Sequence, residues 1–355
     1  MNPTKGDSRG MSMRWLAGIV GLAAACTVLA QTPAMSPKEG QEAATQVQQQ
    51  RAQPLNNAPV WKEIRSGEPE YTNLPGRETN ILIQSQGQTW RAARTPITTA
   101  GGALIALVLL ALAGYFAWRG PINVHGNLTG RMIERFTFVR RVAHWTQAFM
   151  FLALGISGLI LTFGKNILLP LIGPTLFSWL AMLSKAVHNF TGPIFSIALV
   201  VFILLFVRNN IPRAYDWNWI AKFGGMLDRT GATHVPSGKF NAGEKALFWG
   251  LVVGLCVVLT VTGYILNFPN FNQTRATMQL ANIIHLMAAM LAIAMACFHI
   301  YLGTIGMTGA LDAMRTGYVD ETWAKEHHEY WYNDVKAGKE AAGEGGAPAI
   351  VQRAV

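Results

Sequence analysis

Hydrophobic residues along this chain gather into five long stretches that contain no Asp or Glu. Each is close to the ~20 residues that a helix needs to cross ~30 Å of hydrocarbon. Because lipid offers no partner for unpaired backbone groups, we predict that all five are transmembrane helices. They run from Thr98 to Trp118, Val142 to Phe163, Ala186 to Val207, Ala246 to Leu266 and Ile283 to Ile305.

A sixth apolar stretch, Trp15 to Ala30, is shorter and lies near the N-terminus. Basic residues precede it, and it ends in Val28-Leu29-Ala30 before the polar Gln31. This order of basic, apolar and small residues is typical of a secretory signal peptide. The alternative is an uncleaved membrane anchor, and under either interpretation the segment that follows is exported.

The distribution of Lys and Arg predicts how the helices are oriented across the membrane. Of the 355 residues, 51% are hydrophobic and 14% are charged, which is typical of a membrane protein, and the net charge is +10. Residues 119–141, 208–245 and 306–355 together hold sixteen Lys and Arg, whereas the other two loops between the stretches hold three. Such an excess marks the cytoplasmic side, so the first, third and fifth helices are predicted to run inward. The basic charge therefore gives no support for a nucleic-acid partner.

All three cysteines, Cys26, Cys256 and Cys297, lie within apolar stretches, and the sequence has no Cys-x-x-Cys pair. This excludes a cysteine-held iron–sulfur cluster, a thioredoxin-like site and covalently attached c-type haem. For Cys256 and Cys297 the expected role is that of a small buried hydrophobic residue.

Four of the eight histidines lie inside predicted helices, where polar groups are costly and usually functional. His285 and His299 share the fifth helix, fourteen residues apart, which is ~21 Å along the axis and places them in opposite leaflets. Both point toward nearly the same neighbours, since fourteen steps of ~100° come within ~40° of whole turns. His144 begins the second helix at the inner side, and His188 begins the third at the outer side. Each leaflet thus receives two histidines, His188 with His285 outside and His144 with His299 inside.

Two imidazoles from different helices at one depth are what a six-coordinate haem iron requires. With both axial positions filled, such a haem carries electrons rather than binding oxygen. We therefore predict two b haems, with these four histidines as iron ligands. For any one histidine the alternative is a helix-to-helix hydrogen bond or a headgroup contact. A zinc site would need three or four ligands at one depth, and here the histidines separate into two levels.

Glycines occur in the same helices, where they either leave room for the faces of a flat macrocycle or allow close helix packing. They are Gly155, Gly158, Gly192, Gly250 and Gly254. The other histidines lie outside the predicted helices and are expected to be ordinary surface residues. They are His125, His234, His327 and His328.

Short motifs surround these positions. They are Arg141 to Thr146 (RVAHWT), Lys185 to Gly192 (KAVHNFTG), Gly238 to Lys245 (GKFNAGEK) ahead of Phe248-Trp249, and Trp323 to His328 (WAKEHH). Together with the spacing of His285 and His299, they resemble the gamma subunit, the cytochrome b subunit, of respiratory formate dehydrogenase. The resemblance covers roughly residues 131–335 and is carried by the whole set of motifs.

The resemblance implies a redox subunit. His188 and His285 would hold the outer haem, and His144 and His299 the inner haem. Formate would be oxidised on a molybdenum- or tungsten-pterin alpha subunit, and an iron–sulfur beta subunit would pass the electrons on. Menaquinone or ubiquinone would be reduced beside the inner haem, in a bacterial inner membrane.

The resemblance also implies a quinone site formed by Asn241, Gly243 and His299, with His299 serving both haem and quinone. Glu244 stands where we expect glutamine. The residues themselves also favour a helix cap, because Asn three residues before Glu, ahead of an apolar run, matches a capping box. Both interpretations can hold, since helix N-terminal amides polarise an oxygen that bears negative charge.

The expected fold is an all-α integral membrane protein, with a four-helix haem-binding bundle and one additional N-terminal transmembrane helix. Its predicted parts are a signal peptide at 1–30, a mostly extended periplasmic arm at 31–96, the additional helix at 97–118, the diheme domain at 119–310 and a cytoplasmic tail at 311–355. The arm has too few apolar residues for a core of its own. We expect it to dock on periplasmic subunits.

Two other functions fit parts of the pattern. The histidine layout alone also permits a diheme anchor of another periplasmic oxidoreductase, such as a hydrogenase or thiosulfate reductase. A haem-free transporter or assembly anchor is the alternative from another class. The lack of Asp and Glu in the five stretches argues against transport.

Overall fold

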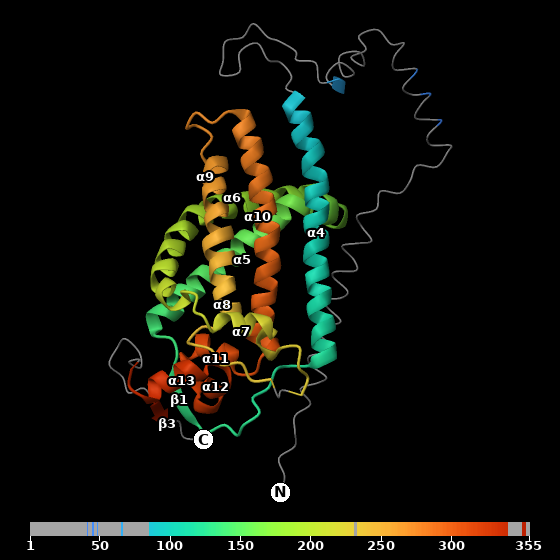
Figure 1. Cartoon of the computed structure of the whole chain (residues 1–355). Helices are drawn as coiled ribbons and strands as arrows, with labels where there is room; N and C mark the ends of the chain where they lie inside the picture. Colours follow the sequence, from blue (N-terminus) through green and yellow to red (C-terminus); the bar gives the residue numbers. More distant parts are fainter. Residues whose placement is uncertain are drawn as a thin grey trace.

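The computed structural model describes residues 85–230, 233–339 and 350–352, together with five positions between 41 and 66. The predicted signal peptide at 1–30 lies outside the described residues, as does most of the predicted arm. In the described part, five helical spans are long and apolar enough to cross a membrane. Figure 1 shows them as one bundle with short helices and strands gathered at one end. The predicted all-α membrane bundle with an additional N-terminal helix is confirmed.

Each span contains one of the predicted stretches. The first three are α4 (Ser85–Arg119), α5 (Phe138–Ile167) and α6 (Leu169–Phe206). The fourth is continuous through α8 (Ala242–Leu247), the π-helical η3 (Phe248–Leu255) and α9 (Cys256–Asn267). The fifth is α10 (Arg275–Tyr301), which a π-helical segment, η4 (Leu302–Gly306), extends.

Two helices begin earlier than predicted. α4 starts at Ser85, so the end of the predicted extended arm is helical, and Pro96 lies inside the helix. α6 starts at Leu169 rather than near residue 186. Lys185 does not end it, because a lysine stem can lie along apolar surface while its charge reaches polar surroundings. His188 therefore lies well inside α6, and the prediction that it begins the helix was wrong.

Short elements fill the segments that the charge pattern predicted to be cytoplasmic. Between α6 and α8 lie η1 (Val207–Asn210), α7 (Asp216–Ala221) and η2 (Phe223–Gly225). After α10 come α11 (Ala310–Arg315), α12 (Glu321–His327) and α13 (Glu329–Lys336). A small antiparallel sheet has the order β2 (Tyr318–Asp320), β1 (Arg131–Glu134), β3 (Ile350–Gln352). Figure 1 places the labelled members of this group together at one end of the bundle.

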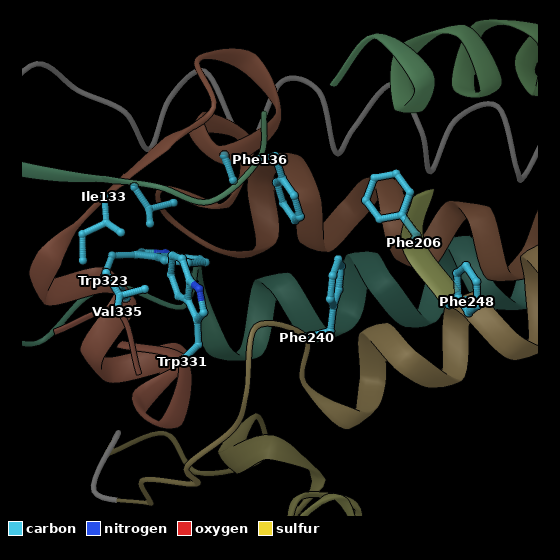
Figure 2. Packing of buried hydrophobic residues seen from close by; sticks show 11 residues of the cluster. Ile133, Phe136, Phe206, Phe240, Phe248, Trp323, Trp331 and Val335 are labelled. Atoms are coloured by element: carbon cyan, nitrogen blue, oxygen red, sulfur yellow. The ribbon is translucent and has the colours of Figure 1, made fainter. Parts of the chain in front are cut away.

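A buried cluster of aromatic and aliphatic side chains joins these short elements to the bundle (Figure 2). Ile133 of β1 is 0% exposed, and Phe206 of α6 and Trp331 of α13 are each 2% exposed. Burying a side chain of this size stabilises a fold by about 1.5–3 kcal/mol. The cluster thus holds β1, α13 and the end of α6 as one packed unit.

The additional helix α4 packs along α10. At Gly101 a Cβ would collide with the side chain of Met290, so glycine permits this close approach. At the other end of α4, Arg119 donates from Nε to the Met226 carbonyl at 3.0 Å and from Nη2 to the Asp228 carbonyl at 2.9 Å. These contacts fix α4 to the bundle and to the loop after η2.

Candidate functional site

The two histidines predicted for the outer leaflet, called here the outer pair, lie against each other. His188 of α6 and His285 of α10 have ring centroids 6.1 Å apart, and their ring planes are inclined at 71°. Both side chains are partly buried. The structure therefore brings together the two residues that chain order and charge had paired.

Each outer histidine also contacts a hydroxyl. The Nδ1 of His188 lies 2.9 Å from Ser157 Oγ, and the Nδ1 of His285 lies 2.9 Å from Thr262 Oγ1. Ser157 comes from α5 and Thr262 from α9. Four helices thus contribute to this pair, two with an imidazole and two with a hydroxyl.

The inner pair has the same spacing. His144 of α5 and His299 of α10 have ring centroids 6.1 Å apart, with planes inclined at 62°. Trp145 packs edge-on against His144 and donates its Nε1 hydrogen to the Met314 carbonyl at 3.0 Å, which ties α5 to α11. Among the described residues, the buried Nδ1 of His144 has no hydrogen-bond partner.

A packed layer separates the two pairs. On α10, Ala288, Ala292 and Ala296 are buried and lie between the two histidines, on the same face by helical spacing. Ala292 and Ala296 belong to one buried cluster with Phe195, Leu199, Leu251 and Cys256. The histidine pairs are therefore two separate sites.

The spacing within each pair fits one iron atom between two imidazoles. A histidine nitrogen binds a first-row metal at about 2 Å, and its ring centroid lies about 1 Å behind that nitrogen, so two axial rings have centroids about 6 Å apart. Both pairs measure 6.1 Å. In the outer pair the Nδ1 atoms face hydroxyls, which leaves Nε2 for a metal. The residues present fit a bis-histidine haem at both levels.

A bare metal ion fits less well. In residues 85–230 and 233–339, no three His, Cys, Asp or Glu side chains come together in a way that could hold a metal. Protein zinc sites use three or four such ligands. Two ligands are enough for haem iron, because the porphyrin nitrogens fill the other positions.

The segment that resembles a quinone motif forms the start of α8. The Asn241 side chain accepts a hydrogen bond from the Glu244 backbone N–H at 2.9 Å, and the Glu244 carboxylate accepts one from the Asn241 N–H at 2.9 Å. This reciprocal pair is a capping box, so the predicted helix cap is confirmed.

The negative charge of Glu244 lies between Arg135 and the inner pair in its interactions: it pairs with Arg135 and acts on His299. Its carboxylate accepts hydrogen bonds from Arg135 Nη2 at 2.9 and 3.2 Å. Arg135 is 4% exposed and packs over the rings of Phe136 and Phe240. The charge of Glu244 acts electrostatically on His299. The capped segment and the inner pair are thus electrostatically linked.

Gly243 lies in a tight contact. A Cβ at this position would lie 2.7 Å from the Trp219 ring of α7, and a Cβ at Gly224 would collide with the same ring. Gly224 has φ of +61°, a conformation that glycine adopts without strain. The indole of α7 therefore lies against the start of α8.

Comparison with known proteins identifies the family. A model of the prokaryotic cytochrome b561 family matches residues 135–317, about half of the chain, and this range contains all four histidines. The chain belongs to the prokaryotic cytochrome b561 family.

Curated relatives give a narrower comparison. The cytochrome b556(Fdn) subunit of nitrate-inducible formate dehydrogenase from Escherichia coli K12 is 30% identical over 214 residues, which cover 58% of this chain and 93% of that protein. The cytochrome b556(fdo) subunit of formate dehydrogenase from the same strain is 29% identical over 217 residues, covering 60% and 97%. The cytochrome b556 subunit from Haemophilus influenzae is 27% identical over 202 residues, covering 55% and 79%. The resemblance noted in the sequence is confirmed.

This cytochrome b561 chain is a multi-pass membrane cytochrome b, and haem b is its cofactor. The family model begins at residue 135, after the end of α4 at Arg119. The additional helix thus lies outside the matched region.

The glycines of the cytochrome b561 bundle differ in their surroundings. A Cβ at Gly155 or Gly192 would meet nothing within 4 Å. A Cβ at Gly250 would lie 3.2 Å from Met295 of α10, so this glycine serves helix packing, whereas one at Gly254 would lie 3.2 Å from the Trp249 carbonyl of its own π-helical segment. Gly158 faces the outer pair, since its Cβ would lie 3.3 Å from His188.

Two histidines expected at the surface are enclosed instead, and that prediction was wrong. His328 is 1% exposed, with Nδ1 2.7 Å from the Gly238 carbonyl, and Trp323 packs against both His327 and His328. Burial lowers the pKa of His327 to about 4 and the pKa of His328 well below its ordinary value. The loop before α8 and the indoles of Trp323 and Trp331 enclose His328, which sequence spacing did not reveal.

The other two histidines outside the spans pair with carboxylates. His125 Nδ1 lies 3.5 Å from Glu326, and His234 Nε2 lies 2.8 Å from Glu329. Their side chains are 58% and 46% exposed, as expected for surface residues.

Sequence reasoning missed three polar residues at the sites: Ser157, Thr262 and Arg135. The first two are hydroxyl residues within apolar spans, which is a weak signal because Ser and Thr in helices often bond to their own backbone. Arg135 entered the sequence argument only as part of the charge count. Its contact with Glu244 depends on folding of the loop before α8 against β1.

Proposed function

We propose that this chain is the membrane diheme cytochrome b subunit of a respiratory formate dehydrogenase. It carries electrons from periplasmic formate oxidation to a quinone that is reduced near the cytoplasmic face. The observation that carries the proposal is the presence of two histidine pairs at two levels of one bundle, each with ring centroids 6.1 Å apart. The names of the relatives support formate as the electron source.

The four histidines have defined roles in this proposal. His188 and His285 hold the outer haem, and His144 and His299 hold the inner haem. When bound, haem supplies a one-electron iron centre whose potential the axial ligands and their surroundings tune. The helices keep each imidazole in place, and α10 sets the two levels ~21 Å apart.

Sidedness follows from charge. The basic segments that follow α4, α6 and α10 lie at the end of the bundle that holds the inner pair, so this end faces the cytoplasm. In this orientation the chain is a protein of the bacterial inner membrane with its N-terminal arm in the periplasm and its C-terminus in the cytoplasm. Electrons then cross the membrane toward the side from which the quinone takes protons.

The proposed quinone site is formed by Asn241, Gly243 and His299. A quinone oxygen gains negative charge on reduction, and both the first-turn amides of α8 and the imidazole of His299 favour such charge. Glu244 caps the helix and neutralises Arg135, so its place near this site is set by the fold. Menaquinone and ubiquinone both fit this chemistry.

The partners in the proposal are an iron–sulfur beta subunit and a molybdenum- or tungsten-pterin alpha subunit. Formate oxidation belongs to the alpha subunit, and this chain contributes electron transfer and quinone reduction. The alpha and beta subunits are proposed to contact the exported residues 31–96 and the start of α4. These parts of the chain lie outside the family match.

Haem analysis of the purified chain tests the proposal. We expect two haem b per chain and, with the partner subunits present, reduction of both by formate. His188→Ala should remove the outer haem and retain the inner one, whereas His125→Ala, at an exposed side chain, should retain both. A folded preparation with fewer than two haems would contradict the diheme proposal. Haem reduction by hydrogen, or oxidation of pre-reduced haem by thiosulfate, without any haem reduction by formate, would instead favour an anchor of another oxidoreductase.

A further inference from the structure

The hydroxyls of Ser157 and Thr262 make the same set of contacts at the outer pair. Ser157 Oγ donates its hydrogen to the Ala153 carbonyl at 2.7 Å, and Thr262 Oγ1 donates to the Val258 carbonyl at 2.7 Å. A hydroxyl has only one hydrogen to donate. Each oxygen is therefore left as an acceptor toward the imidazole nitrogen 2.9 Å away.

This arrangement determines the tautomer of both imidazoles. An oxygen that can only accept requires a hydrogen on the facing Nδ1, so the lone pair of each neutral ring lies on Nε2. Metal-bound histidines commonly donate their second N–H to such an acceptor, which fixes the ring orientation and raises the basicity of the ligand. Back-bonding of Ser or Thr to its own helix is common, but a second contact to a histidine ring at both members of one pair is not explained by it.

The inner pair lacks this feature. The Nδ1 of His144 is buried without a hydrogen-bond partner within the described ranges, and neither His144 nor His299 faces a hydroxyl there. The two pairs share a spacing of 6.1 Å between ring centroids, so they differ in what their second nitrogens meet and not in the distance between their rings.

We propose that Ser157 and Thr262 are positioning residues for the outer haem, which hold His188 and His285 in the Nε2-ligating tautomer and shift the redox equilibrium of that haem toward the oxidised form. The inference rests on the proposed diheme function. A more basic ligand stabilises ferric iron relative to ferrous iron. The effect is specific to the outer haem because the hydroxyls contact only the outer pair.

The test uses the full chain loaded with haem, with optical redox titration and low-temperature electron paramagnetic resonance of each haem. Ser157→Ala and Thr262→Val should each move the reduction equilibrium of the outer haem about three- to tenfold toward the reduced form, the size of one neutral hydrogen bond. The double variant should move it further, and the resonance of the outer ferric haem should change. The inner haem should keep the values of the parent protein.

Three control variants separate positioning from packing. Thr260→Val removes a buried hydroxyl from the same helix, and this hydroxyl has no partner among the described residues, so both haems should stay at their parent values. Ser157→Thr and Thr262→Ser retain the hydroxyl and should retain the parent equilibrium. Loss of the outer haem in a hydroxyl-free variant, with retention in its conservative counterpart, also supports the proposal.

Two results would overturn the inference. One is an unchanged equilibrium and resonance of the outer haem in the hydroxyl-free double variant. The other is an equal change in the hydroxyl-free and the conservative variants, which would indicate packing alone. A parent protein with fewer than two haems would instead contradict the proposed function, so the two failures are distinguishable.

Discussion

The outer and inner histidine pairs have equal spacing but different surroundings. At the outer pair, hydroxyls from α5 and α9 face both Nδ1 atoms. At the inner pair, the buried Nδ1 of His144 has no hydrogen-bond partner among the described residues, and the carboxylate of Glu244 and the buried Arg135 belong to a packed unit outside the helix core. Helix register alone can set the distance within a pair. The hydrogen bonds and charges beside it come from neighbouring elements, and these make the two sites chemically different.

This difference has a structural basis in the length of the elements. The outer pair lies among long helices, where the available polar partners are hydroxyls one turn from a backbone carbonyl. The inner pair lies near α11, to which Trp145 beside His144 is hydrogen-bonded, and Arg135 packs over the Phe136 and Phe240 rings of the aromatic cluster of Figure 2. Tuning of the outer site is therefore local to the bundle, whereas tuning of the inner site depends on the folding of that cluster.

The largest expected effect comes from removing one ligand from each pair on the same helix. His285→Ala should eliminate the outer haem and His299→Ala the inner one, so each variant should keep one of two haems per chain. A buried bis-histidine site that loses one axial ligand has no replacement nearby among the described residues. Pyridine haemochrome assays with redox titration would identify the haem that remains. Loss of both haems in each variant, or of the same haem in both, would contradict the division into two sites.

A smaller effect is expected from acid, and it should arise at the inner end. The folded-state pKa of His327 is about 4, below the ordinary 6.5, so its neutral form stabilises the fold fully above pH 6.5. That contribution is lost as pH falls from 6.5 toward 4, because the unfolded chain binds the proton more readily. Hydrogen bonds from Lys336 and Tyr332 outweigh the effect of burial and lower the pKa of the Glu321 carboxyl to about 2. Glu321 therefore loses its contribution to stability only at lower pH.

The melting temperature of His327→Gln should therefore fall less between pH 6.5 and 4 than that of the parent protein. The free energy of unfolding that the parent loses through His327 is up to about 3 kcal/mol at the acid limit. His125→Gln, at a side chain that is 58% exposed, is the matched control and should leave the profile as in the parent protein. Thermal unfolding in detergent, followed at both haem absorbances, would measure this. Equal slopes for the two variants would show that acid acts elsewhere.

Much of the bundle could be predicted from the sequence, because hydrophobic length and the positive-inside rule act along the chain. The five spans and the pairing of His188 with His285 and His144 with His299 follow from these signals. The start of α6 at Leu169, the burial of His328 and the contact of Arg135 with Glu244 could not be predicted in this way. They depend on a kink at Gly173 and on packing between segments about 100 residues apart, such as β1 and the loop before α8.

The smallest expected effect concerns Glu244, the one carboxylate in the described part of the chain that is linked to the inner pair. Glu244→Gln preserves an oxygen that can accept the capping hydrogen bond from Asn241 but removes the charge beside Arg135 and His299. Because Glu244 is 35% exposed, the lost ion pair should cost only about 1–2 kcal/mol, less than a fully buried pair. Loss of negative charge should also shift the inner haem about two- to tenfold toward its reduced form and leave the outer haem unchanged.

The shift of the inner haem in Glu244→Gln is the counterpart of the shift of the outer haem expected for the Ser157 and Thr262 variants. The first arises from a charge and the second from a hydrogen bond. Redox titration at two salt concentrations would separate the two causes, because an exposed charge is screened by salt and a buried hydrogen bond is not. Asp312→Asn, which breaks the exposed ion pair of Asp312 and Arg315 at the same end of the bundle, is the control and should leave both haems unchanged. If Glu244→Gln moved the outer haem as much as the inner one, the two sites would not be electrostatically independent, and the comparison between them would fail.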